Sequence, residues 1–295
     1  MTKSNQDNLT TSNQENENGS PEARKFAQQG ETDRLMKHYE EAIANFNRAI
    51  ALNPNYAWAI AHRGEVFRLI ESYEKAIADF SHSLLLKSSA WTLAHRGASY
   101  YKLKHYQKAL LDLNQAIDLQ PNYPWAIIYK INIYILMERY EEALIDFDRT
   151  IALDDTIIPS WYGERGLLLS YLGHYDEAIY CCETGWQKNP NDYISLYTLA
   201  VIKAHCQGLA AAQAEIDKTR QILIAQNTKS GCAGVIYRLG GLAAIQGNLE
   251  QALNYLQTAI SLDNEPLELA RRDLAWLELR QNSHFKFLTK RENFT

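Results

Sequence analysis

Residues 55–84 read "NYAWAIAHRGEVFRLIESYEKAIADFSHSL", and the word "AHRG" within them decides how the rest of the chain is interpreted. The word occurs as Ala61–Gly64 and again, 33 residues later, as Ala94–Gly97. A His beside an Arg could belong to an active site, whereas a fixed spacing of this size is typical of a repeat architecture. Aligned on both copies, the chain gives seven segments, most of them 33–35 residues long, which begin near Ala23, Ala57, Ala90, Pro124, Pro159, Tyr193 and Ala233.

The same kinds of residue recur at fixed positions, counted from the start of each segment. Position 8 is small, at Gly30, Gly64, Gly97, Gly166, Ala200 and Gly240. Position 17 is Tyr, at Tyr39, Tyr73, Tyr106, Tyr140 and Tyr175. Position 20 is Ala, and position 24 is large and apolar, at Phe46, Phe80, Leu113, Phe147 and Leu256. Such a pattern indicates one structural unit used many times.

Each segment carries the spacing of two amphipathic helices, since apolar residues fall at i, i+3, i+4 and i+7. In the third segment, Leu93 and Gly97 share one face of the first helix, and Ala109, Leu113 and Ala116 share one face of the second. Small residues allow the two helices to approach closely, and the aromatic and large apolar residues fill the space that is left. The segments therefore predict paired helices.

These positions resemble the tetratricopeptide repeat, and the stretch over 55–84 resembles its bacterial, notably cyanobacterial, variety. The resemblance extends over 23–264 and implies an all-α, right-handed superhelical solenoid of about seven antiparallel helix pairs, with a capping helix after the last repeat. The sixth repeat is degenerate, because it lacks Tyr at position 17 and has a longer second helix.

The two ends of the chain read differently from the repeats. Residues 1–22 are polar and contain no apolar segment of a secretory signal, so we expect a disordered tail. Residues 265–295 hold one amphipathic pattern, in which Leu274, Trp276 and Leu277 would cover the open end of the array while Phe285 and Leu288 fold back.

Composition excludes several classes of function. A net charge of −5 with interspersed signs argues against a nucleic-acid-binding protein and against a polybasic membrane surface. The longest apolar run, over 124–137, is too short for membrane insertion. The four cysteines form no CxxC pair, which fits neither a zinc site nor a disulfide framework and suits a cytoplasmic protein.

A ladder of opposite charges follows the repeats. Position 7 carries Arg63, Arg96, Lys130 and Arg165, and position 23 carries Asp79, Asp112 and Asp146. We expect these residues to pair across the helix interface and fix the register. Pairing within a repeat, as Arg96 with Asp112, and pairing to the preceding repeat, as Arg96 with Asp79, fit the sequence equally well.

Recurring aromatic residues are the best candidates for partner binding. Position 2 carries Trp58, Trp91 and Trp125, and Tyr56 and Tyr123 precede two of these tryptophans. The resemblance implies that these residues line the concave groove together with Arg68 and Tyr101 at position 12. Aromatic residues and Arg are frequent hot-spot residues of interfaces. The alternative, that each Trp packs on the adjacent turn and sets the repeat spacing, fits the periodicity as well.

The candidate chemistry is sparse. His62 and His95 share position 6 of neighbouring repeats, but no carboxylate or thiol stands at equivalent positions to complete a metal site, so we expect partly exposed helical histidines and no metal or other cofactor. No nucleophile-elbow, zincin, P-loop or dinucleotide motif occurs, so we predict no catalytic residue and no enzyme.

These observations predict a protein–protein interaction scaffold that holds a peptide or a helix of a partner in its groove. The chaperone-tail clamp of the resembled family needs Lys at position 5 and Asn at position 9, where this chain has Ala27 and Glu31, so a chaperone C-terminus is not the expected partner. Self-association is the alternative within binding, and a cryptic metal-binding protein or enzyme is the alternative from another class.

Overall fold

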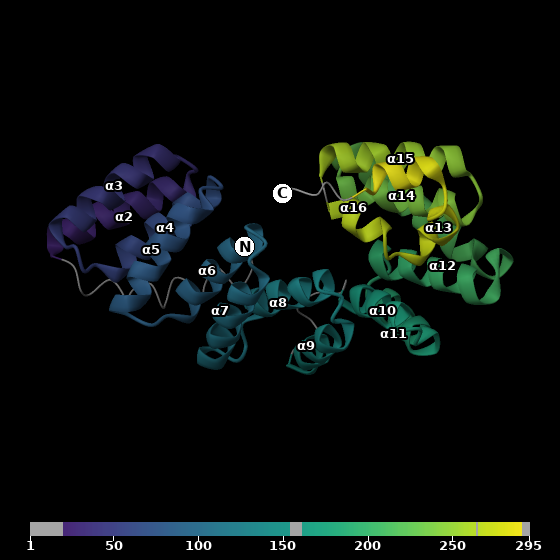
Figure 1. The fold of residues 1–295 in the computed structure, drawn as a ribbon, viewed down its shortest axis with the longest axis horizontal. Coiled ribbons are helices and arrows are strands. Elements are labelled where there is room, and N and C mark those ends of the chain that lie inside the picture. The colour runs from purple at the N-terminus through teal and green to yellow at the C-terminus, as the bar shows by residue number, and fades with distance from the viewer. Residues whose placement is uncertain (1–19, 154–160, 264, 291–295) are drawn as a thin grey trace. The chain divides into compact units, whose positions relative to one another are not determined.

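The computed structural model describes residues 20–153, 161–263 and 265–290, and these are helical with short connections (Figure 1). The chain divides into two compact units, unit 1 up to Ile133 and unit 2 from Tyr134. The all-α class of paired helices that the sequence predicts is confirmed. The predicted repeat start at Pro159 lies outside the described residues.

Unit 1 consists of three helix pairs and most of a further helix. The helices are α2 (Pro21–Leu35), α3 (Tyr39–Leu52), α4 (Ala57–Leu69), α5 (Tyr73–Leu86), α6 (Ala90–Lys102), α7 (Tyr106–Leu119) and α8 (Pro124–Leu136), whose last turn belongs to unit 2. Each odd-numbered helix begins at the Tyr of position 17, and α4 and α6 begin where the alignment places a repeat. Consecutive helices pack on one another in pairs.

Unit 2 continues the same succession. Its helices are α9 (Tyr140–Leu153), α10 (Trp161–Tyr171), α11 (Tyr175–Lys188), α12 (Tyr193–Gln207), the 3-10 helix η2 (Leu209–Ala212), α13 (Gln213–Ser230), α14 (Ala233–Ile245) and α15 (Leu249–Leu262). The expected irregularity of the sixth repeat is the 18-residue α13, which η2 precedes.

The small residue at position 8 lies where the paired helices touch. A Cβ added at Gly64 would stand 3.1 Å from the ring of Phe80, and one at Gly97 would stand 3.0 Å from Leu113. The residues at positions 8 and 24 therefore pack directly against each other, as the small residue at position 8 and the large residue at position 24 predict. Phe80 and Leu113 are fully buried in these contacts.

Both ends differ from the expectation. Residues 1–19 of the predicted tail lie outside the described residues, but α2 already begins at Pro21. Ser20 caps this helix by accepting a hydrogen bond from the Ala23 amide at 3.2 Å, and Pro at the first helical position needs no hydrogen-bond acceptor. Pro21 and Glu22, which the sequence pattern assigns to the tail, therefore belong to α2.

The predicted single capping helix is divided into α16 (Glu265–Ala270), the 3-10 helix η3 (Leu274–Leu279) and α17 (Ser283–Leu288). The side chains of Asp273 and Asn282 accept hydrogen bonds from backbone amides and so start a new helix at two points. Trp276 and Phe285 are buried as expected, whereas Leu277 is exposed to 37%.

Candidate functional site

A row of closely spaced rings, stacked except for the tilted last one, crosses α4, α6 and α8 of unit 1. In order along the row, which we call the aromatic row, the rings are Trp58, His62, Trp91, His95, Trp125 and Tyr129. Successive ring centroids are 3.9, 4.9, 4.0, 4.4 and 4.4 Å apart. The row follows from the sequence because positions 2 and 6 of one helix lie four residues apart and share a face.

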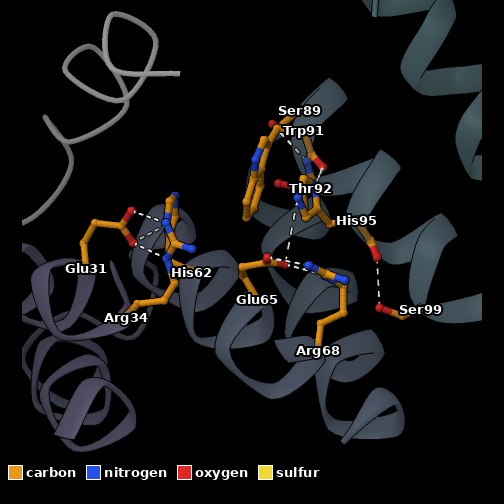
Figure 2. Close-up of polar contacts among 10 residues, drawn as sticks. All are labelled: Glu31, Arg34, His62, Glu65, Arg68, Ser89, Trp91, Thr92, His95 and Ser99. Atoms are coloured by element: carbon orange, nitrogen blue, oxygen red, sulfur yellow. Dashed lines mark hydrogen bonds and ion pairs between the residues drawn. The ribbon is translucent and has the colours of Figure 1, made fainter. Parts of the chain in front are cut away.

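Carboxylate–guanidinium pairs accompany the two histidines (Figure 2). Glu31 accepts two hydrogen bonds from Arg34, at 2.6 and 2.7 Å, and lies 3.0 Å from Nδ1 of His62. Glu65 accepts two from Arg68, at 2.7 and 2.8 Å, and lies 3.9 Å from Nε2 of His95. The arrangement therefore repeats: a Glu and an Arg of one repeat stand beside the His of the next.

Burial and charge fix the protonation states here. Burial would raise the pKa of Glu31, but the hydrogen bonds from Arg34 and His62 outweigh it and hold this pKa at about 2. Burial between two indoles lowers the pKa of His95 to about 4, although the negative charge of Glu65 opposes the shift. Near neutral pH, His95 is therefore an uncharged ring that stacks like an aromatic residue.

The predicted groove residues differ in how much surface they present. Tyr56 is fully buried and Trp58 is 6% exposed, so both are placed for packing inside the stack. The other five are half-buried: Arg68, Trp91, Tyr101, Tyr123 and Trp125. Tyr101 meets the Tyr129 ring edge-on, with centroids 5.5 Å apart, and so extends the row.

Two charge pairs of the ladder form within a repeat. Arg63 donates to both carboxylate oxygens of Asp79 at 2.7 Å, and Arg96 does the same to Asp112. The remaining guanidinium nitrogen reaches the preceding repeat, where Arg63 binds Asn47 at 2.7 Å and Arg96 binds Ser81 at 3.1 Å. Each Arg thus joins two neighbouring repeats.

Arg165 departs from this pairing. Its own repeat has Cys181 at position 23, and Arg165 instead donates to Asp148 of the preceding repeat at 2.6 Å. Asp148 stands at position 25, like Asn47 and Ser81, so the link to the preceding repeat persists, while within its own repeat Arg165 interacts with the Cys181 thiol in place of a carboxylate. Lys130 is half-buried on α8, and Asp146 is buried on α9.

Models of known protein families match three parts of the chain. The description "Tetratricopeptide repeat" matches residues 90–123 and 233–266, and "TPR repeat" matches residues 30–69. A tetratricopeptide repeat protein from Parabacteroides merdae has a similar structure, with a TM-score of 0.68 and 19% identity over 87% of this chain and 99% of that one. The chain is a tetratricopeptide repeat protein.

Other solved structures share the fold over smaller parts of the chain. Pseudomonas aeruginosa pilF matches with a TM-score of 0.57 and 20% identity, over 68% of this chain and 91% of that one. YrrB, described as a TPR protein with an unusual peptide-binding site, matches with a TM-score of 0.52 and 20% identity, over 60% of this chain and 91% of that one. No curated protein matches the sequence significantly.

The two histidines of this tetratricopeptide repeat protein do not face each other across a metal site. The Trp91 ring stacks on His62 from one repeat and on His95 from its own, so it lies between the two imidazoles. Among the described residues, no three His, Cys, Asp or Glu side chains group as metal ligands. None of the described helices combines the length and hydropathy that crossing a membrane requires.

Sequence reasoning identified the tryptophans but not their histidine partners, and it took His95 for a partly exposed residue. His95 is only 8% exposed, because the ring is enclosed by Trp91 and Trp125. Two signals were present: His follows Trp by four residues in two repeats, and Glu followed by Arg three residues later recurs as Glu31 with Arg34. Both spacings place the side chains on one helix face.

Proposed function

We propose that this tetratricopeptide repeat protein is an interaction scaffold that holds a peptide or a helix of a partner protein against the aromatic row of unit 1. The proposal rests mainly on one observation, the continuous row of rings across three successive repeats, which are stacked from Trp58 to Trp125 and end in the tilted ring of Tyr129. Large aromatic side chains bury much apolar area, and an Arg beside them adds hydrogen-bond donors.

Rigidity favours this use of the row. Trp91 and Trp125 are each held by a stacked imidazole, and Arg68 is held by both oxygens of Glu65. Side chains that are already ordered lose little conformational entropy when a partner binds. The half-buried residues Trp91, Tyr101 and Trp125 would therefore contribute more to affinity than mobile side chains of the same area.

The charges near the row indicate what kind of partner fits. Arg34 and Arg68 are already paired with Glu31 and Glu65, so neither offers an uncompensated positive charge to a carboxylate. A partner with apolar and aromatic side chains and a few neutral hydrogen-bonding groups suits this surface better than an acidic tail. This agrees with the expectation that chaperone C-termini are not its partners.

Affinity capture from the source cell, read by mass spectrometry, tests the proposal. We expect Trp91→Ala and Trp125→Ala to lose the partners that the unmodified chain captures, by about tenfold or more, since hot-spot truncations cost about 2 kcal/mol or more. Trp186→Ala is the matched control, because Trp186 is a half-buried Trp of unit 2 on α11. Retained capture by both unit 1 variants, with helicity unchanged in circular dichroism, would exclude the aromatic row.

A further inference from the structure

The segment 265–290 of unit 2 packs on the first helices of the last two repeats and on the second helix of the last one. Within it, η3 contacts α12 and α14, α16 contacts α14 and α15, and α17 contacts α15. It consists of three helices of six residues each, which are too short to be stable alone. Its position therefore depends on what its side chains bind.

A single carboxylate provides the central polar contact. Oδ2 of Asp273 accepts hydrogen bonds from the hydroxyls of Tyr197 and Tyr237, both at 2.8 Å, while Oδ1 accepts from the Ala275 amide at 2.9 Å. The two tyrosines are the fifth residues of α12 and α14, so successive repeats offer one donor each. Burial and the charge of Asp273 raise the pKa of both hydroxyls well above the ordinary value, which keeps them protonated donors.

Arg272 makes the second polar contact of the segment, at the end of α8. Arg272 donates to the backbone carbonyls of Ile135 and Leu136 at 2.5 and 3.3 Å, and lies 3.5 Å from the carboxylate of Glu138. These carbonyls are in the last turn of α8, where they lack partners within the helix and carry the negative end of its dipole. A cation is thus recognised in the fourth repeat, whereas the two tyrosines stand in the sixth and the seventh.

Trp276 fills the apolar part of the contact. It is fully buried, with its ring 5.7 Å from that of Tyr237 and 5.9 Å from that of Phe285. A Cβ added at Gly240 would stand 2.9 Å from this indole, so the absence of a side chain there makes room for it. Arg272, Asp273 and Trp276 therefore act as three anchors in the order Arg-Asp-x-x-Trp.

The fit of the segment is incomplete. Within the described residues, the Trp276 indole nitrogen and Nε of Arg280 are buried without a hydrogen-bond partner. A buried donor without an acceptor weakens the interaction by the loss of its hydration. A ligand that keeps the three anchors and supplies an acceptor at the indole nitrogen would bind this surface more tightly than the segment does.

We propose that the faces of α12 and α14 form a second peptide-binding site, that segment 265–290 is its resident occupant, and that a partner segment with an Arg-Asp-x-x-Trp arrangement displaces it. The site lies in unit 2 and uses none of the residues of the aromatic row. Its failure and the failure of the proposed function are therefore separate results.

The test uses a fluorescent peptide with the sequence of residues 265–290 and the full chain. We expect the peptide to bind the Asp273→Asn chain at least tenfold more tightly than the unmodified chain, because the substitution releases the resident segment. Tyr197→Phe with Tyr237→Phe, added to the Asp273→Asn chain, should weaken this binding at least tenfold. A peptide that itself carries Asp273→Asn is the control and should bind at least tenfold more weakly.

Absence of peptide binding by a folded Asp273→Asn chain would overturn the proposal. Formation of a dimer through exchanged segments, seen by sedimentation, would replace the partner by a second copy and overturn it as well. If Asp273→Asn does not fold, hydrogen exchange on the unmodified chain decides. Exchange of η3 and α17 amides at least tenfold faster than those of α14 supports a displaceable segment, and equal exchange makes it a fixed part of the core.

Discussion

At the scale of single residues, Arg96 decides between the two geometries that the sequence left open. Its guanidinium group donates hydrogen bonds to both carboxylate oxygens of Asp112, while Asp79 is bound by Arg63. We expect Arg96→Leu and Asp112→Leu to cost about 3 kcal/mol each, since each leaves a buried charge without its partner. The double variant should cost much less than the sum, with a coupling of about 1–3 kcal/mol.

Urea unfolding of the four chains measures this coupling. The matched control cycle pairs Arg96→Leu with Asp79→Leu, for which the two costs should add within about 0.5 kcal/mol. A larger coupling to Asp79 than to Asp112 would mean that the ladder runs between repeats.

Left-handed residues at the turn between paired helices give a second prediction at this scale. Position 15 has a φ of about +60° at Lys37, Glu71, Lys104 and Glu138, and glycine at Gly173 and Gly247. Side chains are strained there, so Glu71→Gly should stabilise the chain by up to about 1 kcal/mol, although added backbone entropy in the unfolded state offsets part of the gain. Gly173→Ala should destabilise it by about 1 kcal/mol. Thermal unfolding of both variants checks the signs, and a drop in melting temperature for Glu71→Gly would contradict the argument.

At the scale of elements, most of the helix pattern could be predicted because every repeat carries the same kinds of residue at the same positions. The Tyr of position 17 begins helices such as α3 and α5, and Gly at position 8 meets the large residue of position 24. The C-terminal segment has no second copy to be aligned with. Its division depends on the caps Asp273 and Asn282, which start new helices within a single apolar pattern.

The candidate site was only partly predictable for a related reason. Trp58, Trp91 and Trp125 stand out by spacing within the sequence, whereas the stacking of His62 on Trp91 depends on how one repeat is rotated on the next. That rotation is a property of packed helices, and the sequence periodicity does not contain it. The same applies to the full burial of Tyr56, which differs from the half-buried Tyr123 at the equivalent place before Trp125.

The enclosed His95 makes the row sensitive to acid. Its pKa is about 4 in the folded chain against an ordinary value of 6.5, so the unfolded chain binds more protons between these two values. The stability that the neutral ring provides is complete above pH 6.5 and is lost as the pH falls towards 4, by at most about 3 kcal/mol. Tyr129 occupies the equivalent position of the next repeat. We therefore expect His95→Tyr to remove this part of the pH dependence.

Urea unfolding at pH 7.5 and pH 5, followed by tryptophan fluorescence, tests the effect. His38→Asn is the control, because His38 is an exposed residue at the start of α3 and lies outside the aromatic row. Equal loss of stability in the unmodified chain and in His95→Tyr would rule out His95 as its source.

At the scale of the whole molecule, each helix packs mainly on its partner within the repeat and next on the adjacent repeat, and the chain divides into two units. In such an array, stability is close to a sum of repeat stabilities and nearest-neighbour contacts, so damage should stay local. Phe80 in unit 1 and Leu256 in unit 2 are both fully buried, and truncation to Ala should cost about 3–5 and 2–5 kcal/mol respectively.

Hydrogen exchange read by mass spectrometry should show faster exchange in α4, α5 and α6 for Phe80→Ala and unchanged exchange in α14 and α15. Leu256→Ala, as the reciprocal control, should speed exchange in α14 and α15 and leave α2 to α5 unchanged. Uniform acceleration of every helix by either variant would mean that the array opens as one cooperative body, because only then does a lost contact in one repeat lower the opening energy of a distant one.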